Sequence, residues 1–427
     1  MAILRQEYDL QSEADFGSTP EQLDAALVRI LESPPVAGGQ NEARRALGRL
    51  QEAWEFAKTT PRPCRIMVNE TKSELGARVG ELRQSFAITM DNLHATARFL
   101  AGLPGLKMLV MISDSLELRP GAELLLFAQN VCPNERELNE VSLLGDSIDL
   151  RRELLDFTSS ANANRITFYP MQASGLQVSS VFGVENRAYE LQALRGVDFT
   201  QRSVQQGGLR ALAKETGGTV ILNRNGFRKA LASVARDMDS YYSLAYVPPN
   251  AGDGQSHRID VRVNVPKARV RHRLSYRDKS PAQVRDERLE GAIAFGLMDN
   301  PLGLRLAAGT VQPADADQYS LPLHLLVPRD SLTFFPGPEG DRANVEVVVR
   351  ASEARSGQLV TLEKSFDPVR PAGDAATLNL QLAVTLPEGV YVLGVAVSDS
   401  GTGATSVVST TLAIHDPLRN RADSSAD

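Results

Sequence analysis

The sequence has few cysteines, no long apolar run and no excess of basic residues. Its two cysteines, Cys64 and Cys132, cannot form a disulfide framework, and with five scattered histidines they do not make a four-ligand zinc set. Whether the two form one bridge stays open at this point. The longest apolar runs, such as 107–113, are far shorter than the roughly 20 residues that span a bilayer. We therefore predict no zinc-finger site and no membrane span.

The charge balance argues against a protein that binds nucleic acid through its overall charge. The chain of 427 residues has a net charge of -6. The first 300 residues hold 37 basic and 37 acidic side chains, and the acidic excess lies in residues 301–427. A nucleic-acid protein of that kind would carry a clear basic excess. The first residues, MAILRQEYDLQ, have no basic stretch followed by an apolar one, which predicts no signal peptide.

In the first 239 residues, helical patterns alternate with short apolar strands. Thr19-Pro20-Glu21-Gln22 has the spacing of a helix N-terminus, with Thr19 as the cap and Gln22 completing a capping box. The run 106–113 is almost uninterruptedly apolar, which is typical of a strand buried on both faces of a parallel sheet. Further helices are predicted over 41–58, 72–103, 148–160, 208–215 and 227–238, and further strands over 165–171 and 219–222. This alternation predicts an α/β layered sheet.

After residue 239 the apolar residues follow a period of two. Segments 241–247, 256–265 and 269–276 predict a small antiparallel unit, and 281–297 predicts a helix. Later strands, which indicate an immunoglobulin-like β-sandwich, are predicted over 321–327, 345–350, 378–384, 390–398 and 407–414. The expected organisation is an α/β domain over 1–239, an antiparallel β-unit over 240–278, a helical linker over 279–302, a β-sandwich over 303–416 and a disordered tail over 417–427.

Two stretches resemble a known family. The run PGLKMLVMISDSLELRPG (104–121) resembles the fourth-strand region of von Willebrand factor type A domains. The Thr-Gly-Gly turn and the Tyr-Tyr-x-Leu-x-Tyr segment within 212–249, together with 257–277, resemble the VWFA-related domain common in Acidobacteria. Ser275 replaces a glycine of that family's Arg-x-Gly-Tyr-like motif. The resemblance covers roughly residues 1–278 and implies a Rossmann-like layered sheet, here incomplete because its first strand is missing.

The resemblance also implies a metal site. Type A domains commonly bind a divalent metal through an Asp-x-Ser-x-Ser loop after the first strand, a threonine from a second loop and an aspartate from a third, ligands that suit Mg²⁺. The resemblance implies Asp114 as that aspartate and Thr19, or else Ser18, as that threonine. No Asp-x-Ser-x-Ser follows an apolar strand here, and Asp114 lacks the usual following glycine. We therefore expect no cofactor, or Mg²⁺ only if an upstream segment supplies the motif. As residues alone, Thr19 reads as a helix cap and Asp114 as a cap after its strand.

A second pattern is LGDSI (144–148), which resembles the nucleophile block of GDSL-type hydrolases. In those enzymes the serine, here Ser147, attacks an ester after a base activates it. No strong apolar strand precedes the block, and no Asp-x-x-His pair follows it in the sequence. Gly145-Asp146-Ser147 also fits a helix N-terminus with Ser147 as the cap.

Basic residues alternate along the last predicted strand of the antiparallel unit, at Lys267, Arg269, Arg271 and Arg273. A strand would place them on one face, and Arg258 and Arg262 would add to that face from the neighbouring strand. The pattern predicts either a polyanion-binding ribbon or the solvated outer face of a sheet.

Taken together, the residues and the resemblance predict a non-enzymatic interaction or adhesion-type protein. We expect it to bind an unknown protein partner and no nucleic acid. The alternatives are a serine esterase around Ser147 and a polyanion binder. The family resemblance implies an exported protein, either periplasmic or extracellular.

Overall fold

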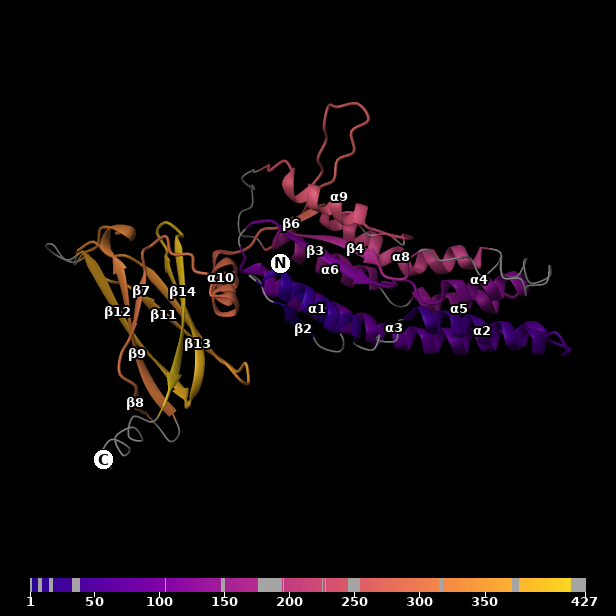
Figure 1. Cartoon of the computed structure of the whole chain (residues 1–427), viewed down its shortest axis with the longest axis horizontal. Helices are drawn as coiled ribbons and strands as arrows, with labels where there is room; N and C mark the ends of the chain where they lie inside the picture. Colours follow the sequence, from indigo (N-terminus) through magenta and orange to yellow (C-terminus); the bar gives the residue numbers. More distant parts are fainter. Residues whose placement is uncertain are drawn as a thin grey trace. The chain divides into compact units, whose positions relative to one another are not determined.

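The computed structural model is a mixed α/β structure that divides into two compact units (Figure 1). The first unit contains Met1–Ala97, Gly105–Pro249 and Gln255–Asp278, and the second contains Arg98–Pro104, Asn250–Gly254 and Lys279–Asp427. The structure describes residues 2–6, 10–14, 18–32, 39–103, 105–146, 150–175, 194, 196–224, 226, 228–244, 254–314, 318–338, 340–370 and 376–415. The predicted tail over 417–427 lies outside these residues.

The first unit combines helices with three two-stranded sheets. Its helices are α1 (Pro20–Glu32), α2 (Gly39–Ala57), α3 (Pro63–Ala101, which ends in the second unit), α4 (Ala122–Val131), α5 (Glu137–Asp146), α6 (Leu150–Ala163), α8 (Val197–Thr216) and α9 (Arg228–Asp239). Its strands are β1 (Ile3–Gln6), β2 (Leu10–Ala14), β3 (Lys107–Ser113), β4 (Ile166–Gln172), β5 (Ser256–Arg258) and β6 (Ser275–Arg277). The mixed α/β class expected for this part of the chain is therefore confirmed, and of the predicted apolar strands β3 and β4 are found.

The central feature of the first unit is the parallel pair β3–β4, in which Ser113 lies opposite Gln172. Beyond β4, a third segment adds one parallel bridge, between Met171 and Ile221. The full strand predicted over 219–222 is wrong. At Gly218 the chain runs so close to β4 that an added Cβ would overlap the backbone oxygen of Phe168.

Helices cover both faces of β4. Phe168 packs edge-on against Phe157 of α6, with 5.6 Å between ring centroids. Tyr169, the next residue along, points to the other face and packs with Ala230 and Val234 of α9. All seven residues of β4 are buried. This two-sided burial explains why the strand reads as a nearly continuous apolar run.

Two helices of the first unit escaped the sequence prediction, and two others are longer than predicted. α4 and α5 are the missed helices, and α4 follows Gly121, which has a left-handed backbone conformation and offers no side-chain cap. α3 begins at Pro63 rather than at residue 72, and α8 begins at Val197 rather than at 208. Glycine at 207 and 208 weakens the helical pattern of α8. Gly208 lies so close to Leu116 that an added Cβ would overlap its backbone oxygen.

The two cysteines form a disulfide that ties the start of α3 to the end of α4. Cys64 and Cys132 have Cα atoms 5.6 Å apart, and the bridge closes 68 residues of chain. Cys132 is buried in the core formed by α2, α3, α4 and α5, whose largest members include Leu50, Met67 and Phe127. The sequence left open whether the two cysteines pair, and the structure shows that they do because the fold brings them together.

The antiparallel unit predicted over 240–278 forms only in part. β5 and β6 pair over three residues each, with His257 opposite Tyr276. The rest of the predicted strands 256–265 and 269–276 does not pair as strands. Residues 262–270 are exposed in an extended segment (Figure 1), whereas Leu274 donates its backbone N–H to the oxygen of Glu215. Residues 241–244 are not in a strand, and 245–250 lie outside the described residues. Two strands without a third to cover their apolar side are only marginally stable, which explains the difference.

The second unit is a sandwich of two antiparallel sheets around one apolar core. One sheet has the order β11-β10-β13-β14, and the other has the order β12-β9-β7 with β8 paired to β9. The strands are β7 (Arg305–Ala308), β8 (Gln312–Pro313), β9 (Gln318–Pro328), β10 (Val345–Glu353), β11 (Leu359–Phe366), β12 (Thr377–Pro387), β13 (Gly389–Asp399) and β14 (Thr405–Ile414). All five strands predicted for this part are found, whereas β7, β8 and β11 were missed.

The helix expected over 281–297 is α10 (Pro281–Phe295), which starts with a capping box made by Ser280 and Gln283. α10 packs against the β10-β13-β14 sheet through Leu289 and Ala292, which meet Val348 on β10. This contact makes the helix an integral part of the second unit.

Candidate functional site

Buried polar side chains gather at the carboxyl ends of the parallel segments of the first unit. β3 ends at Ser113 and is followed by Asp114, β4 ends at Gln172, and the segment beyond β4 leads into Asn223. The carboxyl edge of a parallel sheet between helices is where such folds gather ligand-binding groups. Asn223 has a positive φ of 53°, a conformation that asparagine tolerates better than most residues.

A chain of hydrogen bonds joins these strand ends to α8. Gln206 donates from Nε2 to Gln172 Oε1 (3.0 Å) and to Asn223 Oδ1 (3.1 Å). Arg210, one turn later on α8, donates to Gln206 Oε1 over 2.9 Å, and Gln172 donates to the backbone oxygen of Asp114 over 3.3 Å. Gln172 and Gln206 are almost fully buried. We call Asp114, Gln172, Gln206, Arg210 and Asn223 the carboxyl-edge network.

Of the two predicted metal ligands, the structure places Asp114 in this network, half-buried directly after β3. Thr19 instead completes the predicted capping box: its hydroxyl accepts from Gln22 N–H (3.4 Å), and Gln22 Oε1 accepts from Thr19 N–H (2.9 Å). Among the described residues, no three histidine, cysteine, aspartate or glutamate side chains lie close enough together to hold a metal ion. Thr19 is therefore engaged as a helix cap, and we derive no chemistry from a metal ion at this place.

The serine proposed as a hydrolase nucleophile, Ser147, lies outside the described residues. The residues just before it, Gly145 and Asp146, form the end of α5. The helix predicted over 148–160, which Ser147 would cap, is α6 (Leu150–Ala163), and the cap itself lies outside the described residues.

The basic ribbon predicted over 267–273 does not form a strand face. Arg271 is held by Asp237 at the end of α9, through two hydrogen bonds of 2.6 Å, and it also donates to Thr219 Oγ1. Tyr169 donates to the same carboxylate over 3.2 Å. The bond from Arg271 lowers the pKa of Asp237, while burial, followed by the charge of Asp237, raises the pKa of Tyr169 to about 12. Arg271 thus anchors the segment to α9.

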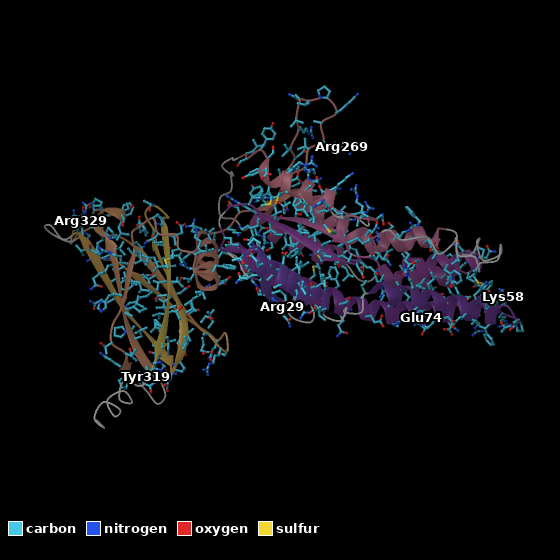
Figure 2. All side chains as sticks on the ribbon, in the orientation of Figure 1. Arg29, Lys58, Glu74, Arg269, Tyr319 and Arg329 are labelled. Carbon is cyan, nitrogen blue, oxygen red and sulfur yellow. A yellow bond between two sulfur atoms is a disulfide. The ribbon has the colours of Figure 1, made fainter. Side chains whose placement is uncertain are left out.

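The remaining basic residues of that segment do not line up either. Arg262 pairs with its neighbour Asp260 over 2.9 Å. Arg273 is half-buried, and burial lowers the pKa of its guanidinium. Arg269 is exposed on the extended segment (Figure 2). The alternating face on which the polyanion hypothesis rested is therefore not present in the described residues.

A feature that the sequence analysis did not single out is the open edge of β3. Ser113 accepts a backbone hydrogen bond from Ala173, which shows that its carbonyl faces β4. Backbone groups of successive residues point to opposite edges of a strand, so those of Met108, Val110 and Ile112 point away from β4. Among the described residues, no strand pairs with that second edge.

The open edge of β3 also exposes apolar side chains. Val110 is 38% exposed and Ile112 is 69% exposed, although strands of parallel sheets are normally buried on both faces. Between Met108 and Ile112 the strand has no charged residue, proline or bulge, the features by which edge strands usually avoid pairing with other chains. This edge is therefore open to pairing.

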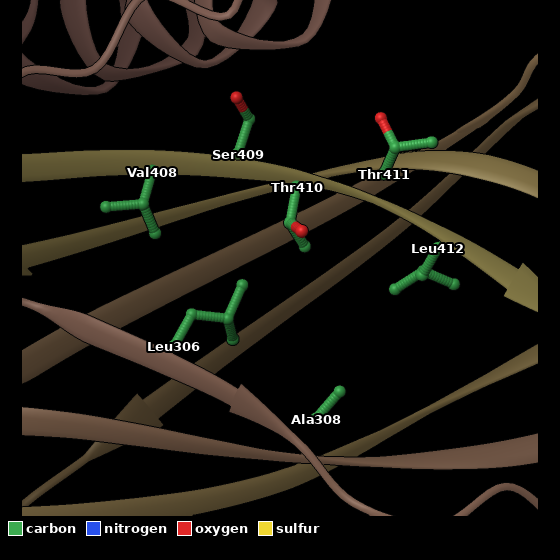
Figure 3. Close-up of a pocket in the computed structure, with 7 residues that line it drawn as sticks. All are labelled: Leu306, Ala308, Val408, Ser409, Thr410, Thr411 and Leu412. Carbon is green, nitrogen blue, oxygen red and sulfur yellow. The ribbon is translucent and has the colours of Figure 1, made fainter.

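The second unit has a groove of its own, of about 470 Å³, between the edge strands β7 and β14 (Figure 3). Leu306 and Ala308 of β7 face Val408, Thr410 and Leu412 of β14, whereas Ser409 and Thr411 point to the opposite side of the strand. The groove is lined by apolar and hydroxyl side chains. It therefore lacks the titratable groups that acid–base chemistry requires.

Sequence reasoning found Asp114 but missed Gln172, Gln206, Arg210 and Asn223. Glutamine and asparagine form no recognisable spacing motif. In addition, Gln172 lies just after the predicted end of its strand, and Gln206 lies just before the predicted start of its helix. The available signal was position, because Gln172 and Asn223 follow two predicted strands whose carboxyl ends would meet at one edge.

Comparison of the sequence with protein-family profiles and with curated proteins found no match in either. Within the described residues, no helix combines the length and the apolar character needed to cross a membrane.

Proposed function

We propose that the protein is a non-enzymatic interaction module that binds an extended protein segment along the open edge of β3. The observation that carries this proposal is the combination of backbone groups that pair with no strand among the described residues and the exposed side chains of Val110 and Ile112 on one apolar strand. Addition of a strand would satisfy those backbone groups and bury those side chains in the same step. The proposed fold class is a von Willebrand type A-like sheet that lacks one strand, followed by an immunoglobulin-like sandwich.

The carboxyl-edge network supports this proposal by its chemistry. Its amides donate and accept hydrogen bonds, its guanidinium donates them, and the backbone oxygen of Asp114 accepts one directly after β3. Such a set recognises polar groups of a bound chain. It lacks an adjacent nucleophile and base among the described residues, the pair on which covalent catalysis depends.

The proposal is tested by selecting peptides from a random phage-displayed library on the immobilised full-length protein. We expect enriched peptides with alternating apolar residues. Their binding should fall at least about tenfold on Ile112→Lys, because a charge on the apolar edge opposes burial of the added strand. Backbone amides of β3 should gain protection from hydrogen exchange when the peptide is bound.

The matched control is Leu143→Lys on α5, since Leu143 is 66% exposed and Ile112 is 69% exposed. Peptides that bind the wild type should bind this control equally well. Absence of any enriched peptide, or peptides that bind Ile112→Lys as well as the wild type, would overturn the proposal.

We further propose that the protein works in an oxidising compartment outside the cytosol. The support is the disulfide between Cys64 and Cys132, because structural disulfides persist in exported proteins and are rare in the cytosol. Non-reducing peptide mapping of protein isolated from its native host should recover the two cysteines in one linked peptide pair. Recovery of both as free thiols, after alkylation during lysis, would contradict this proposal.

A further inference from the structure

A buried cluster of ionisable side chains lies between α3, α4, α8 and the loop 114–121, apart from the open edge of β3. Arg78 of α3 donates from Nη2 to both carboxylate oxygens of Glu117, over 2.8 and 2.9 Å. Arg78 is 4% exposed and Glu117 is 2% exposed. One positive and one negative charge therefore balance each other inside the unit.

Glu123, in the first turn of α4, adds a second carboxyl group to this balanced pair. It is 1% exposed, and neither of its carboxylate oxygens has a hydrogen-bond partner among the described residues. Its own backbone N–H lies near but falls short of hydrogen-bond geometry. An ionised carboxylate in this position would be a buried charge without compensation, which is strongly unfavourable.

The charges around Glu123 favour its neutral form. Burial, followed by the negative charge of Glu117, raises the pKa of Glu123 to about 7, and the positive charge of Arg78 offsets only part of this rise. Within the described residues, the charges that act on Glu123 are those of Glu117 and Arg78. Glu81 of α3, whose side chain is 57% exposed, lies 4.0 Å from Arg78 Nη1.

Helix α8, which packs against α4, also contains buried polar atoms without a partner among the described residues. These are Nε2 of Gln201 and Oε1 of Gln205, one helical turn apart. A carboxyl group without a hydrogen-bond partner in such a buried place is less costly in its neutral form than in its ionised form.

The same helix holds the loop that contains Asp114. Leu116 donates its backbone N–H to the oxygen of Gln205 (3.0 Å), and Gly208 donates to the oxygen of Leu116 (2.8 Å). Leu116 lies between Asp114 of the carboxyl-edge network and Glu117 of the buried cluster. Any loosening of α8 against α4 would thus release the loop at Leu116.

From this arrangement we propose that the buried cluster is a proton-controlled latch on the loop 114–121. With Glu123 protonated, α4, α8 and the loop pack together. Loss of that proton leaves two buried carboxylates, with the exposed Glu81 as a third, around one guanidinium, so the pairing of Leu116 with α8 weakens and the loop opens locally. The latch is independent of the proposed binding at the β3 edge.

The test is hydrogen exchange followed by mass spectrometry on the full-length protein at pH 6 and pH 8, corrected for the intrinsic dependence of exchange on pH. In the wild type, protection of the amides of Leu116 and Gly208 should fall about tenfold or more on going to pH 8, since one pKa unit corresponds to a factor of ten. Glu123→Gln, which is neutral at both pH values, should keep its protection within about twofold. Glu140→Gln on α5, an exposed glutamate, serves as the matched control and should behave as the wild type.

Two results would overturn the latch: equal corrected protection of the wild type at both pH values, or the same loss of protection in Glu123→Gln as in the wild type. If Glu123→Gln does not fold, a carboxyl-carbon NMR titration of the wild type decides instead. We expect one glutamate resonance with a midpoint between pH 6 and pH 8. Its absence would refute the proposal.

Discussion

The two units differ in what their interiors contain. In the first unit, the buried polar groups include Arg78, Glu117 and Glu123, and the carboxylate oxygens of Glu123 have no hydrogen-bond partner among the described residues. In the second unit the core cluster is apolar, and its buried Asp399 accepts hydrogen bonds from Thr402. Apolar packing does not depend on protonation, but a buried charge does. The stability of the first unit therefore depends in part on buried charged groups, so a change of pH or a substitution among them should lower it.

The strands of the two units also differ in how they are buried. β4 is buried along its whole length, whereas β12 alternates between buried and exposed residues from Leu378 to Pro387. A strand buried on both sides needs helices on both faces, and a strand of the sandwich needs only the opposite sheet. The stability of the first unit therefore depends on contacts between its sheet and helices from distant parts of the chain. On β3, one edge stays open among the described residues.

The largest expected effect comes from removing Arg78. Arg78→Ala leaves Glu117 buried without its partner and should lower the free energy of unfolding of the first unit by about 3–5 kcal/mol at pH 8. Hydrogen exchange on the full-length protein reads the two units separately. The control is Arg285→Ala in the second unit, whose partners Glu346 and Glu363 are more than half exposed and remain hydrated. A comparable loss in both variants would remove the contrast between the units.

Reduction of the disulfide should act next most strongly, and only on the first unit. Breaking the bridge between Cys64 and Cys132 frees a long loop in the unfolded chain and should cost about 2–4 kcal/mol. Denaturation with and without a reducing agent, followed by hydrogen exchange, measures the change. The second unit has no cysteine and serves as the internal control. An unchanged first unit would show that the bridge contributes no stability.

The pH dependence should separate the units further. Because the pKa of Glu123 is raised from 4.5 to about 7, the folded protein holds this proton more tightly than the unfolded chain does. Its stabilising contribution is complete below pH 4.5 and is lost as pH rises through about 7, by up to about 3 kcal/mol. Glu123→Gln should flatten this decline in urea denaturation. Burial also raises the pKa of Glu117, so a residual slope of the same sign is expected. A slope identical to that of the wild type would contradict the assignment.

The smallest effect is expected at the surface of the first unit. The ion pair of Arg262 with Asp260 joins side chains that are 88% and 65% exposed. Arg262→Ala should therefore change the free energy of unfolding by less than about 1 kcal/mol, because water and salt screen the pair. Thermal denaturation measures this change. A larger loss would mean that the segment between β5 and β6 is held more firmly than its exposure indicates.

Much of the fold could be predicted from local patterns. The capping box at Thr19 and the alternating strands of the sandwich could be predicted because each signal lies within a few residues. The start of α8 and the helix α4 were missed, because glycines and an uncapped start hide them. Of the candidate site, only Asp114 was found, since the glutamines that meet it come from β4 and α8.

The sequence by itself determined the class of each half, with apolar runs between helical patterns first and period-two strands later, because hydrophobic periodicity is a local property of the chain. Tertiary structure alone decided three features: the pairing of Cys64 with Cys132, the burial of Glu123 beside Glu117, and the exposure of Ile112 on an open edge. Each depends on which distant segments come together. Burial and pairing between such segments arise from the packing of the whole unit, and no short stretch of sequence contains them.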